Sequence, residues 1–366
     1  MTAFRFLVVL LLAAGCGGPR PEKGGARCSH VQAVRQLRGL SICEDVWTCA
    51  RPPQGPFDRV GLHRLAACEG ANGPVVLYLP GMHMNGELPL TDARYDLRLY
   101  LAQAGVRTWG LDYRTHVVPP DAQPSDLAAL NRWTADVFTD DVVWAAGFVR
   151  GSDPGPIYLA GFSYGAGLAY RVAAKRNQGL AGLIILDGFA GDGRAPAGEG
   201  PAIDVGGSRL PYDERKTLLE RVAKDPESPS PVPGFPTAGG ALSDVLFNAQ
   251  SFGGNGGLAN TRDNISEIAV LARLLRSYDR WWPRAALGGS DPGKPPAPLP
   301  VLAFSSTQMG PAWVERVRAS ATTFGGERAR VRELPGHGHL DVLVSRTAAY
   351  QVFEPVRTWL AGQVAP

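Results

Sequence analysis

The stretch from Ile157 to Gly167 constrains the fold of this chain more than any other part of the sequence; it reads Ile-Tyr-Leu-Ala-Gly-Phe-Ser-Tyr-Gly-Ala-Gly. Its first half is a short apolar run typical of a buried strand, and the small residues that follow suit a helix packed closely on a sheet. Ser163 stands between the two halves, with Gly161 and Gly165 two residues to either side. The sequence therefore predicts a strand, a tight turn that carries Ser163, and a helix.

This pattern is the one that a nucleophile elbow requires. The serine sits in a strained backbone conformation, and side chains at the flanking glycine positions would collide with the strand and the helix. With 45 glycines in 366 residues, the pattern Gly-x-Ser-x-Gly can also arise by chance in an ordinary strand–turn–helix. The apolar run before it and the small residues after it favour the elbow, which makes Ser163 a candidate nucleophile.

Apolar runs alternate with amphipathic stretches along most of the chain, which predicts an α/β fold with a mostly parallel sheet. The strands at 46–51 and 59–67 are expected to be antiparallel. The other predicted strands are 74–79, 106–111, 156–160, 180–186, 299–305 and 329–334. The predicted helices are 30–40, 94–104, 127–150, 164–176, 213–224, 264–282, 312–322 and a last one that runs through residue 360.

Residues 188–298 interrupt this alternation and divide the core into 28–187 and 299–366. The segment is rich in glycine and proline, contains two predicted helices and has no regular strand signal. It is expected to be a cap inserted between the sixth and seventh predicted strands. Trp281 and Trp282 are expected to anchor it, either by packing the cap on the core or by contacting substrate.

The N-terminus has the features of a targeting segment. Residues 1–15 contain one charge, Arg5, and an apolar run too short to span a bilayer as a lasting helix. The run ends in Leu-Ala-Ala-Gly before Cys16, which resembles the lipobox of bacterial lipoproteins. The resemblance implies cleavage before Cys16, lipidation of this cysteine and a tether over residues 16–27. The alternative is an ordinary secretory signal in which Cys16 is incidental.

The four remaining cysteines all lie in one early segment. An exported protein in an oxidising compartment would form two disulfides from them. Of the three possible pairings, we expect Cys28–Cys43 around a short helix and Cys49–Cys68 across a hairpin. A metal site is the weaker alternative, because no Cys-x-x-Cys spacing occurs.

Length and charge narrow the class of protein further. A chain of 366 residues can bury a large core. Its net charge of +3 is too small to indicate a nucleic-acid partner. The sequence does not determine the oligomeric state.

A serine nucleophile needs a base within hydrogen-bond reach, and we expect His339 to be that base. It lies in a glycine-rich loop between the last predicted strand and the last helix, from which it can reach the carboxyl ends of the strands. His337 is the other candidate for the base. If it is not the base, its imidazole is expected to stabilise the loop or to be exposed to solvent. Asp341 is expected to be a carboxylate at a helix start. The histidines that precede Ser163 are expected to be structural. For His83 a direct catalytic role is kept as the weaker alternative.

Three motifs together resemble the α/β-hydrolase family, particularly its esterases and lipases. They are the elbow at Gly161–Gly165, the strand end Leu-Pro-Gly-Met-His at residues 79–83, and Gly-His-Leu-Asp at residues 338–341. The resemblance covers residues 46–360 apart from the cap. It implies Ser163 as nucleophile, His339 as base, and an oxyanion hole made by the backbone N–H groups of Met82 and Tyr164, with neither a metal nor an organic cofactor. His83 would shape the oxyanion loop.

The acidic member of the site departs from the commonest family pattern. The family usually places it after the penultimate strand, where residues 303–310 hold no carboxylate. Asp187 ends the strand before that one and keeps the chain order serine, acid, histidine. It is the expected acid; its alternative role is to cap a turn, and Asp192 and Glu315 are lesser candidates. Asp112 is expected to be a structural turn residue paired near Arg114.

The sequence thus leads to a membrane-tethered serine hydrolase of the cell envelope, on the periplasmic or outer-membrane face. It is expected to cleave a carboxylic ester through an acyl-enzyme on Ser163. Peptidase, thioesterase and acyltransferase activities use the same machinery and stay open. A catalytically silent binding lipoprotein on the same fold is the alternative from another class. The acyl and alcohol preferences stay undetermined.

Overall fold

The computed structural model describes residues 28–36, 40–191, 199–205, 210–248, 257–288 and 291–363. The predicted signal peptide, the predicted lipidation site at Cys16 with its tether over residues 16–27, and Asp192 lie outside these residues. Within them, no helix is both long and apolar enough to cross a membrane.

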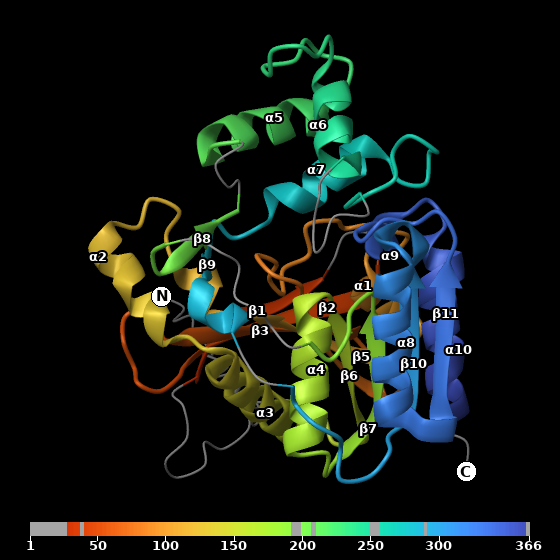
Figure 1. Ribbon diagram of the computed structural model, residues 1–366. Helices are drawn as coiled ribbons and strands as arrows, with labels where there is room; N and C mark the ends of the chain where they lie inside the picture. The colour runs from red at the N-terminus through yellow and green to blue at the C-terminus, as the bar shows by residue number, and fades with distance from the viewer. Residues whose placement is uncertain are drawn as a thin grey trace, which may run out of the picture.

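A mixed, largely parallel sheet of nine strands forms the centre of the molecule, in the order β1-β2-β3-β5-β4-β6-β7-β10-β11 (Figure 1). β1, β2 and β3 are antiparallel to their neighbours, and the strands from β5 to β11 run parallel. Its strands are β1 (Cys28–Gln36), β2 (Ile42–Ala50), β3 (Arg59–Ala67), β4 (Val75–Leu79), β5 (Arg107–Asp112), β6 (Ile157–Phe162), β7 (Leu180–Leu186), β10 (Val301–Ser306) and β11 (Ala329–Leu334). The predicted α/β architecture is therefore present.

Helices cover both faces of this sheet, which buries the central strands. One apolar cluster unites the sheet with α3, α4 and α8, and a second unites the other face with α1, α9 and α10. These helices are α1 (Leu97–Gln103), α3 (Ala135–Ser152), α4 (Tyr164–Lys175), α8 (Pro311–Gly325), α9 (Asp341–Val344) and α10 (Glu354–Gln363). All five residues of β4 are buried, as its continuous apolar run predicts.

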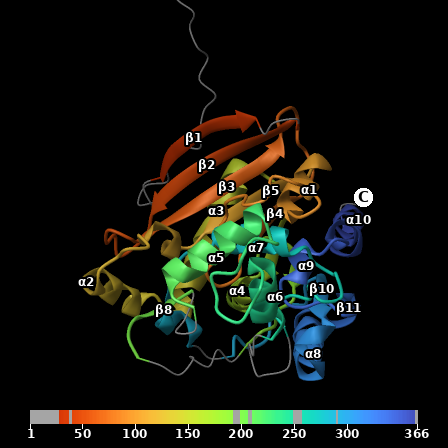
Figure 2. The same ribbon diagram turned by 90° about the horizontal axis from the view of Figure 1, so that it is seen from above.

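The segment between β7 and β10 forms a separate layer over the edge at which the parallel strands end (Figures 1 and 2). It contains α5 (Tyr212–Lys224), α6 (Ala238–Phe247) and α7 (Ile268–Arg276). β8 (Ala202–Asp204) and β9 (Trp281–Pro283) form a two-stranded sheet, which no regular strand signal in this segment indicated. The predicted helix 264–282 holds only over α7, and α6 was not predicted.

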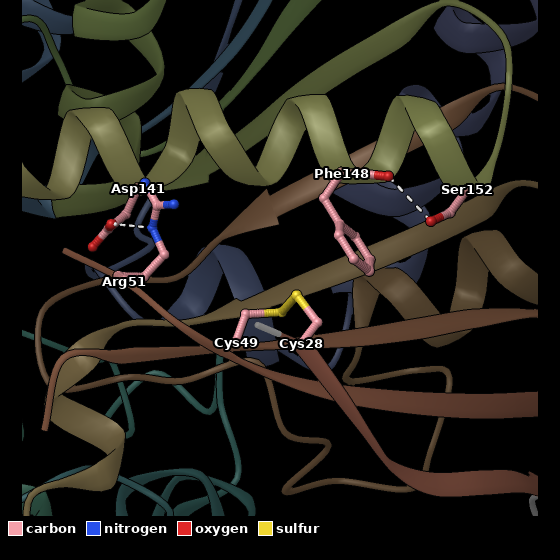
Figure 3. The surroundings of a disulfide bond; sticks show 6 residues. All are labelled: Cys28, Cys49, Arg51, Asp141, Phe148 and Ser152. Atoms are coloured by element: carbon pink, nitrogen blue, oxygen red, sulfur yellow. Dashed lines mark hydrogen bonds and ion pairs between the residues drawn. A yellow bond between two sulfur atoms is a disulfide. The ribbon is translucent and has the colours of Figure 1, made fainter. Parts of the chain in front are cut away.

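The expected helix over residues 30–40 is wrong, and so is the expected disulfide pairing. Residues 28–36 form β1, which pairs with β2 and brings Cys28 opposite Cys49. The disulfides are Cys28–Cys49 and Cys43–Cys68. Figure 3 shows the first of them beneath α3, with the side chain of Phe148 directed toward it. Strand register, which local sequence does not reveal, decides the pairing.

The predicted helix 127–150 begins later than expected, at Ala135. Thr134 is its N-cap, and the Thr134 side chain accepts a hydrogen bond from the backbone N–H of Val137. The residues before it form α2 (Pro124–Leu127) and a short 3-10 helix. Asp141 of α3 accepts hydrogen bonds from Arg51 (2.8 Å, Figure 3) and Arg114 (2.6 Å), which join α3 to the strand ends.

A buried ionic cluster supports the end of β5. Nε2 of His63 lies 2.8 Å from Oδ2 of Asp112, and Nδ1 of His63 lies 3.6 Å from Oε1 of Glu44. Asp112 also accepts a hydrogen bond from the backbone N–H of Gly86 (2.6 Å). The expected pairing of Asp112 near Arg114 is wrong, because the Arg114 guanidinium binds Asp58 and Asp141 instead.

This cluster predicts that the protein loses stability as the pH rises above neutral. Burial alone would lower the pKa of His63, but the charge and hydrogen bond of Asp112 raise it from 6.5 to about 9. A raised folded-state pKa stabilises the protein below pH 6.5, and this contribution is lost as the pH rises through 9. We expect the free energy of unfolding to fall by about 2–3 kcal/mol over this interval.

Urea unfolding at pH 6 and pH 9 measures this loss. A His63→Gln variant keeps a donor for Asp112 but carries no titrating charge, so the loss between pH 6 and pH 9 should shrink by about 2–3 kcal/mol. The share of His116 should stay, because its pKa is raised to about 10 against the effect of burial by the hydrogen bond of Asp279 and by nearby carboxylates. The control is His30→Gln, at an exposed histidine of β1. An unchanged pH dependence in His63→Gln would contradict the assignment.

Candidate functional site

Ser163 lies in a sharp turn between β6 and α4. Its backbone has φ 53° and ψ −115°, a conformation in which non-glycine residues are strained. A Cβ atom at Gly161 would overlap the carbonyl oxygen of Gly165, and one at Gly165 would overlap the carbonyl oxygen of Leu79. Both flanking glycines are therefore required by close packing, as the elbow pattern predicts.

Asp187 follows β7 directly and is completely buried. Its Oδ2 lies 2.6 Å from Nδ1 of His339. Its Oδ1 accepts hydrogen bonds from the backbone N–H of Ser306 (2.7 Å) and from Nε1 of Trp313 (2.9 Å). Because an ionised carboxylate only accepts hydrogen bonds, the contact places the imidazole proton on Nδ1 and leaves Nε2 as the basic nitrogen.

The imidazole of His339 lies beside the turn that carries Ser163. It stacks on the ring of Phe162, the residue before Ser163, with ring centroids 4.8 Å apart. The indole of Trp313 meets it edge-on at 5.3 Å. Gly188, the residue after Asp187, approaches the backbone of Ser163 so closely that a Cβ atom at Gly188 would lie 2.7 Å from the Ser163 carbonyl oxygen. Three distant stretches of sequence thus meet at one edge of the sheet.

The rival site residues have other partners. Nδ1 of His337 donates to the carbonyl oxygen of Pro335 (2.9 Å), which is a loop-stabilising contact. Glu315 lies on an exposed face of α8 and pairs with Arg318. The carboxylate of Asp341, in the first turn of α9, holds the backbone N–H of Gly338 (2.6 Å).

The expected oxyanion donors lie on two elements that flank the serine. Tyr164 is the first residue of α4, so its N–H has no acceptor within the helix. Met82 belongs to the loop after β4, and His83 follows it with φ 65°. Burial lowers the pKa of His83 to about 4, so its ring is neutral near pH 7. Nδ1 of His83 donates to the carbonyl oxygen of Asp279 (2.9 Å), which makes His83 a loop-shaping residue.

The two tryptophans of the insertion pack it on the core. Trp282 is completely buried and meets the ring of Tyr164 at a centroid distance of 5.0 Å and that of Phe138 at 5.4 Å. Nε1 of Trp281 reaches the carbonyl oxygens of Pro119 and Pro120 (both 3.2 Å). These contacts correspond to the first of the two expected roles, packing of the cap on the core, rather than to contact with substrate.

Sequence reasoning missed several residues that support the site. Trp313 and Ser306 hold the second oxygen of Asp187, and Asp279 contacts the oxyanion loop from the insertion. No motif marks any of them, because each acts through a contact between segments far apart in the chain.

Comparisons with known proteins show the family and the fold of this chain. The model of the alpha/beta hydrolase family matches residues 76–350. A Sulfolobus solfataricus protein described as a candidate lipase shares 25% identity and a TM-score of 0.77, over 93% of this chain and 100% of its own. An alpha/beta hydrolase fold protein from Nakamurella multipartita shares 16% identity and a TM-score of 0.51, over 84% and 96% of the two chains. No curated protein matches significantly.

Proposed function

Since the chain belongs to the alpha/beta hydrolase family, we propose that it is a serine hydrolase that cleaves carboxylic esters through an acyl-enzyme on Ser163. The observation that carries this proposal is the 2.6 Å contact between Asp187 and His339, with the imidazole stacked on the residue that precedes Ser163. A buried, oriented imidazole beside a strained serine is the arrangement that activates a hydroxyl nucleophile.

In the proposed reaction, Oγ of Ser163 attacks the ester carbonyl carbon while Nε2 of His339 takes the hydroxyl proton. Asp187 holds the imidazole in the required tautomer and stabilises its protonated form. The N–H groups of Tyr164 and Met82 donate to the oxygen that becomes negative, and each donor is worth about 3 kcal/mol. His339 then gives its proton to the leaving alcohol as the ester C–O bond breaks. Water attacks the acyl-enzyme by the same route and releases the acid.

An active hydrolase with an ester substrate is proposed on two grounds. The ester is suggested by the solved structure with a TM-score of 0.77, which is described as a candidate lipase. Activity is supported by the contact of Asp187 with His339, because it offers an acid although the position where the family usually holds one has no carboxylate. Thioester and peptide bonds can be attacked by the same groups, so the test includes them.

Fluorophosphonate labelling followed by peptide mass spectrometry tests the nucleophile, and p-nitrophenyl esters from acetate to palmitate test the substrate class. We expect one label, on Ser163, and hydrolysis that depends on acyl length. A folded protein that takes no label would support the silent alternative. Faster turnover of matched thioesters or peptide amides would reassign the reaction.

We also propose that the protein is held in the cell envelope by lipid on Cys16. Two disulfides, Cys28–Cys49 and Cys43–Cys68, support an oxidising compartment. Lipid on a cysteine that follows a cleaved signal would retain the protein in the membrane fraction, and a second acyl chain would make this anchoring stable. A Cys16→Ser variant is expected in the soluble fraction with full esterase activity. An unmodified Cys16 in the exported protein would end this proposal.

A further inference from the structure

Helix α7 lies between two segments of the insertion that are each bound to a different loop of the proposed active site. The segment before it, residues 258–266, meets the loop that carries His339. The segment after it, residues 277–283, meets the oxyanion loop at residues 80–87. Figure 1 shows α7 over the edge where the parallel strands end, beside α9.

Asp279 forms the anchor after α7. Its backbone makes two bonds with His83: the N–H of Asp279 donates to the carbonyl oxygen of His83 (2.7 Å), and its own carbonyl accepts from Nδ1 of His83 (2.9 Å). Its carboxylate accepts from Nδ1 of His116 (2.9 Å), Nδ2 of Asn85 (3.1 Å) and Oγ1 of Thr115 (3.3 Å). The donors come from the oxyanion loop and from the 3-10 helix Arg114–Val117.

This anchor acts on the residue beside a proposed oxyanion donor. His83 has a positive φ of 65°, a backbone conformation that only the surroundings hold in place for a histidine. Met82 precedes it, so the direction of the Met82 N–H depends on the position of His83. The main-chain bonds from Asp279 hold His83 on its side chain and on its carbonyl oxygen. The Asp279 carboxylate in turn fixes this main chain through its bonds to His116, Asn85 and Thr115, and these are the bonds that a side-chain variant removes.

The second anchor holds the segment before α7, and it is formed by Asp341, the first residue of α9. Its completely buried carboxylate accepts from the backbone N–H groups of Asn260 (2.8 Å) and Gly338 (2.6 Å) and from Oγ of Ser266 (2.6 Å). Gly338 immediately precedes His339. One carboxylate therefore joins the histidine loop to both ends of the segment before α7.

Backbone contacts reinforce the same anchor. The N–H of Leu340 donates to the carbonyl oxygen of Leu258 (2.7 Å), and the N–H of Arg346 donates to that of Ile265 (2.9 Å). Gly338 lies so close to Ala259 that a Cβ atom at Gly338 would be 2.8 Å from the Ala259 Cα. The histidine loop and the inserted segment are thus packed backbone against backbone.

α7 itself is a short, well-buried connection between the two anchors. Its nine residues rise about 13 Å, and five of them are buried. A helix of this length with a packed face behaves as a rigid rod, because its backbone hydrogen bonds and its packing would both have to break for it to bend.

We propose that α7 is a fixed brace between the oxyanion loop and the histidine loop, with Asp279 and Asp341 as positioning residues at its ends. The proposal rests on the function proposed above. It means that the insertion sets the relative position of the oxyanion donor at Met82 and the base at His339.

Single alanine variants test the two anchors. We expect Asp279→Ala and Asp341→Ala each to lower kcat for p-nitrophenyl acetate about 10-fold, with KM within about twofold, because small displacements of catalytic groups cost rate rather than binding. Asp279→Asn and Asp341→Asn are the matched controls. Their amide oxygens can accept the stronger bonds while the NH2 donates to Thr115 or Ser266, so both should keep at least half of the wild-type kcat.

The double variant Asp279→Ala/Asp341→Ala separates a brace from two independent anchors. Effects of distant, independent sites multiply. If one rigid rod connects the anchors, releasing either end frees it, and the double variant should lose only about 10- to 20-fold. A loss of about 100-fold would overturn the brace, and so would a single variant whose kcat is unchanged.

Milder variants cover the case in which an alanine variant does not fold. Thr115→Val and Ser266→Ala each remove one side-chain bond from the same anchors. The loss of kcat in their double variant is again expected to be smaller than the product of the two single losses. Fluorophosphonate labelling of the wild type serves as the reference. A wild type without label refutes the proposed function, whereas a labelled, active wild type with multiplicative losses refutes the brace alone.

Discussion

Replacing Ser163 by alanine is expected to lower kcat for p-nitrophenyl esters by about 10⁶-fold, the scale that is typical when a catalytic serine is removed. Without Oγ no acyl-enzyme forms, and fluorophosphonate labelling should disappear with the activity. The fold should survive, because the strained turn is held by the surrounding backbone, including the bond from the N–H of Ser163 to the carbonyl oxygen of Leu186 (3.1 Å).

The matched control is Ser152→Ala, at the last residue of α3. This serine donates only to the carbonyl oxygen of Phe148 (3.1 Å, Figure 3), so the variant should keep full activity. Initial rates, labelling and Tm are measured for both proteins. A Ser163→Ala protein that retains a tenth of the wild-type rate would remove Ser163 from the mechanism.

Asp187→Asn is expected to lower kcat about 10³- to 10⁴-fold, because it places the imidazole in the wrong tautomer. The N–H groups of Ser306 and Trp313 both point at one oxygen of Asp187, so an amide oxygen must take that place. The amide NH2 then faces Nδ1 of His339. Nδ1 of His339 then accepts a hydrogen bond from this NH2, so the single imidazole proton lies on Nε2. Nε2 can no longer take the proton of the Ser163 hydroxyl.

The control for Asp187→Asn is Glu315→Gln, which changes the lesser acid candidate, an exposed carboxylate paired with Arg318. We expect no change in kcat from this substitution. Steady-state rates between pH 6 and 9 are measured for both variants. Full activity in Asp187→Asn would show that another carboxylate orients His339.

Local pattern was enough to predict much of the core. The continuous apolar runs of β4, β6 and β7 are buried strands because only a sheet covered on both faces accepts them. The glycines around Ser163 are explained by backbone contacts within 3 Å of their Cβ positions. The expected contact of Asp187 with His339 is present, since the carboxyl ends of β7 and β11, which flank β10, lie at the same edge of the sheet.

Local pattern failed where pairing between distant segments decides the structure. Residues 28–36 carry no alternation strong enough to predict β1, and the strand forms because β2 offers it an edge. The two disulfides follow that register rather than the spacing of the cysteines. β8 and β9 likewise pair across most of the insertion.

The sequence by itself determined the order of Ser163, Asp187 and His339 along the chain, the tight turn at Ser163 and the place of the insertion, because these depend on residue type and spacing along the chain. Only the tertiary structure decided which donors hold Asp187 and how Asp279 and Asp341 join the insertion to the site. Those contacts depend on the relative positions of segments up to some 200 residues apart, as between Asn85 and Asp279. Spacing within a segment carries no information about such distances, because they are set when the whole core packs.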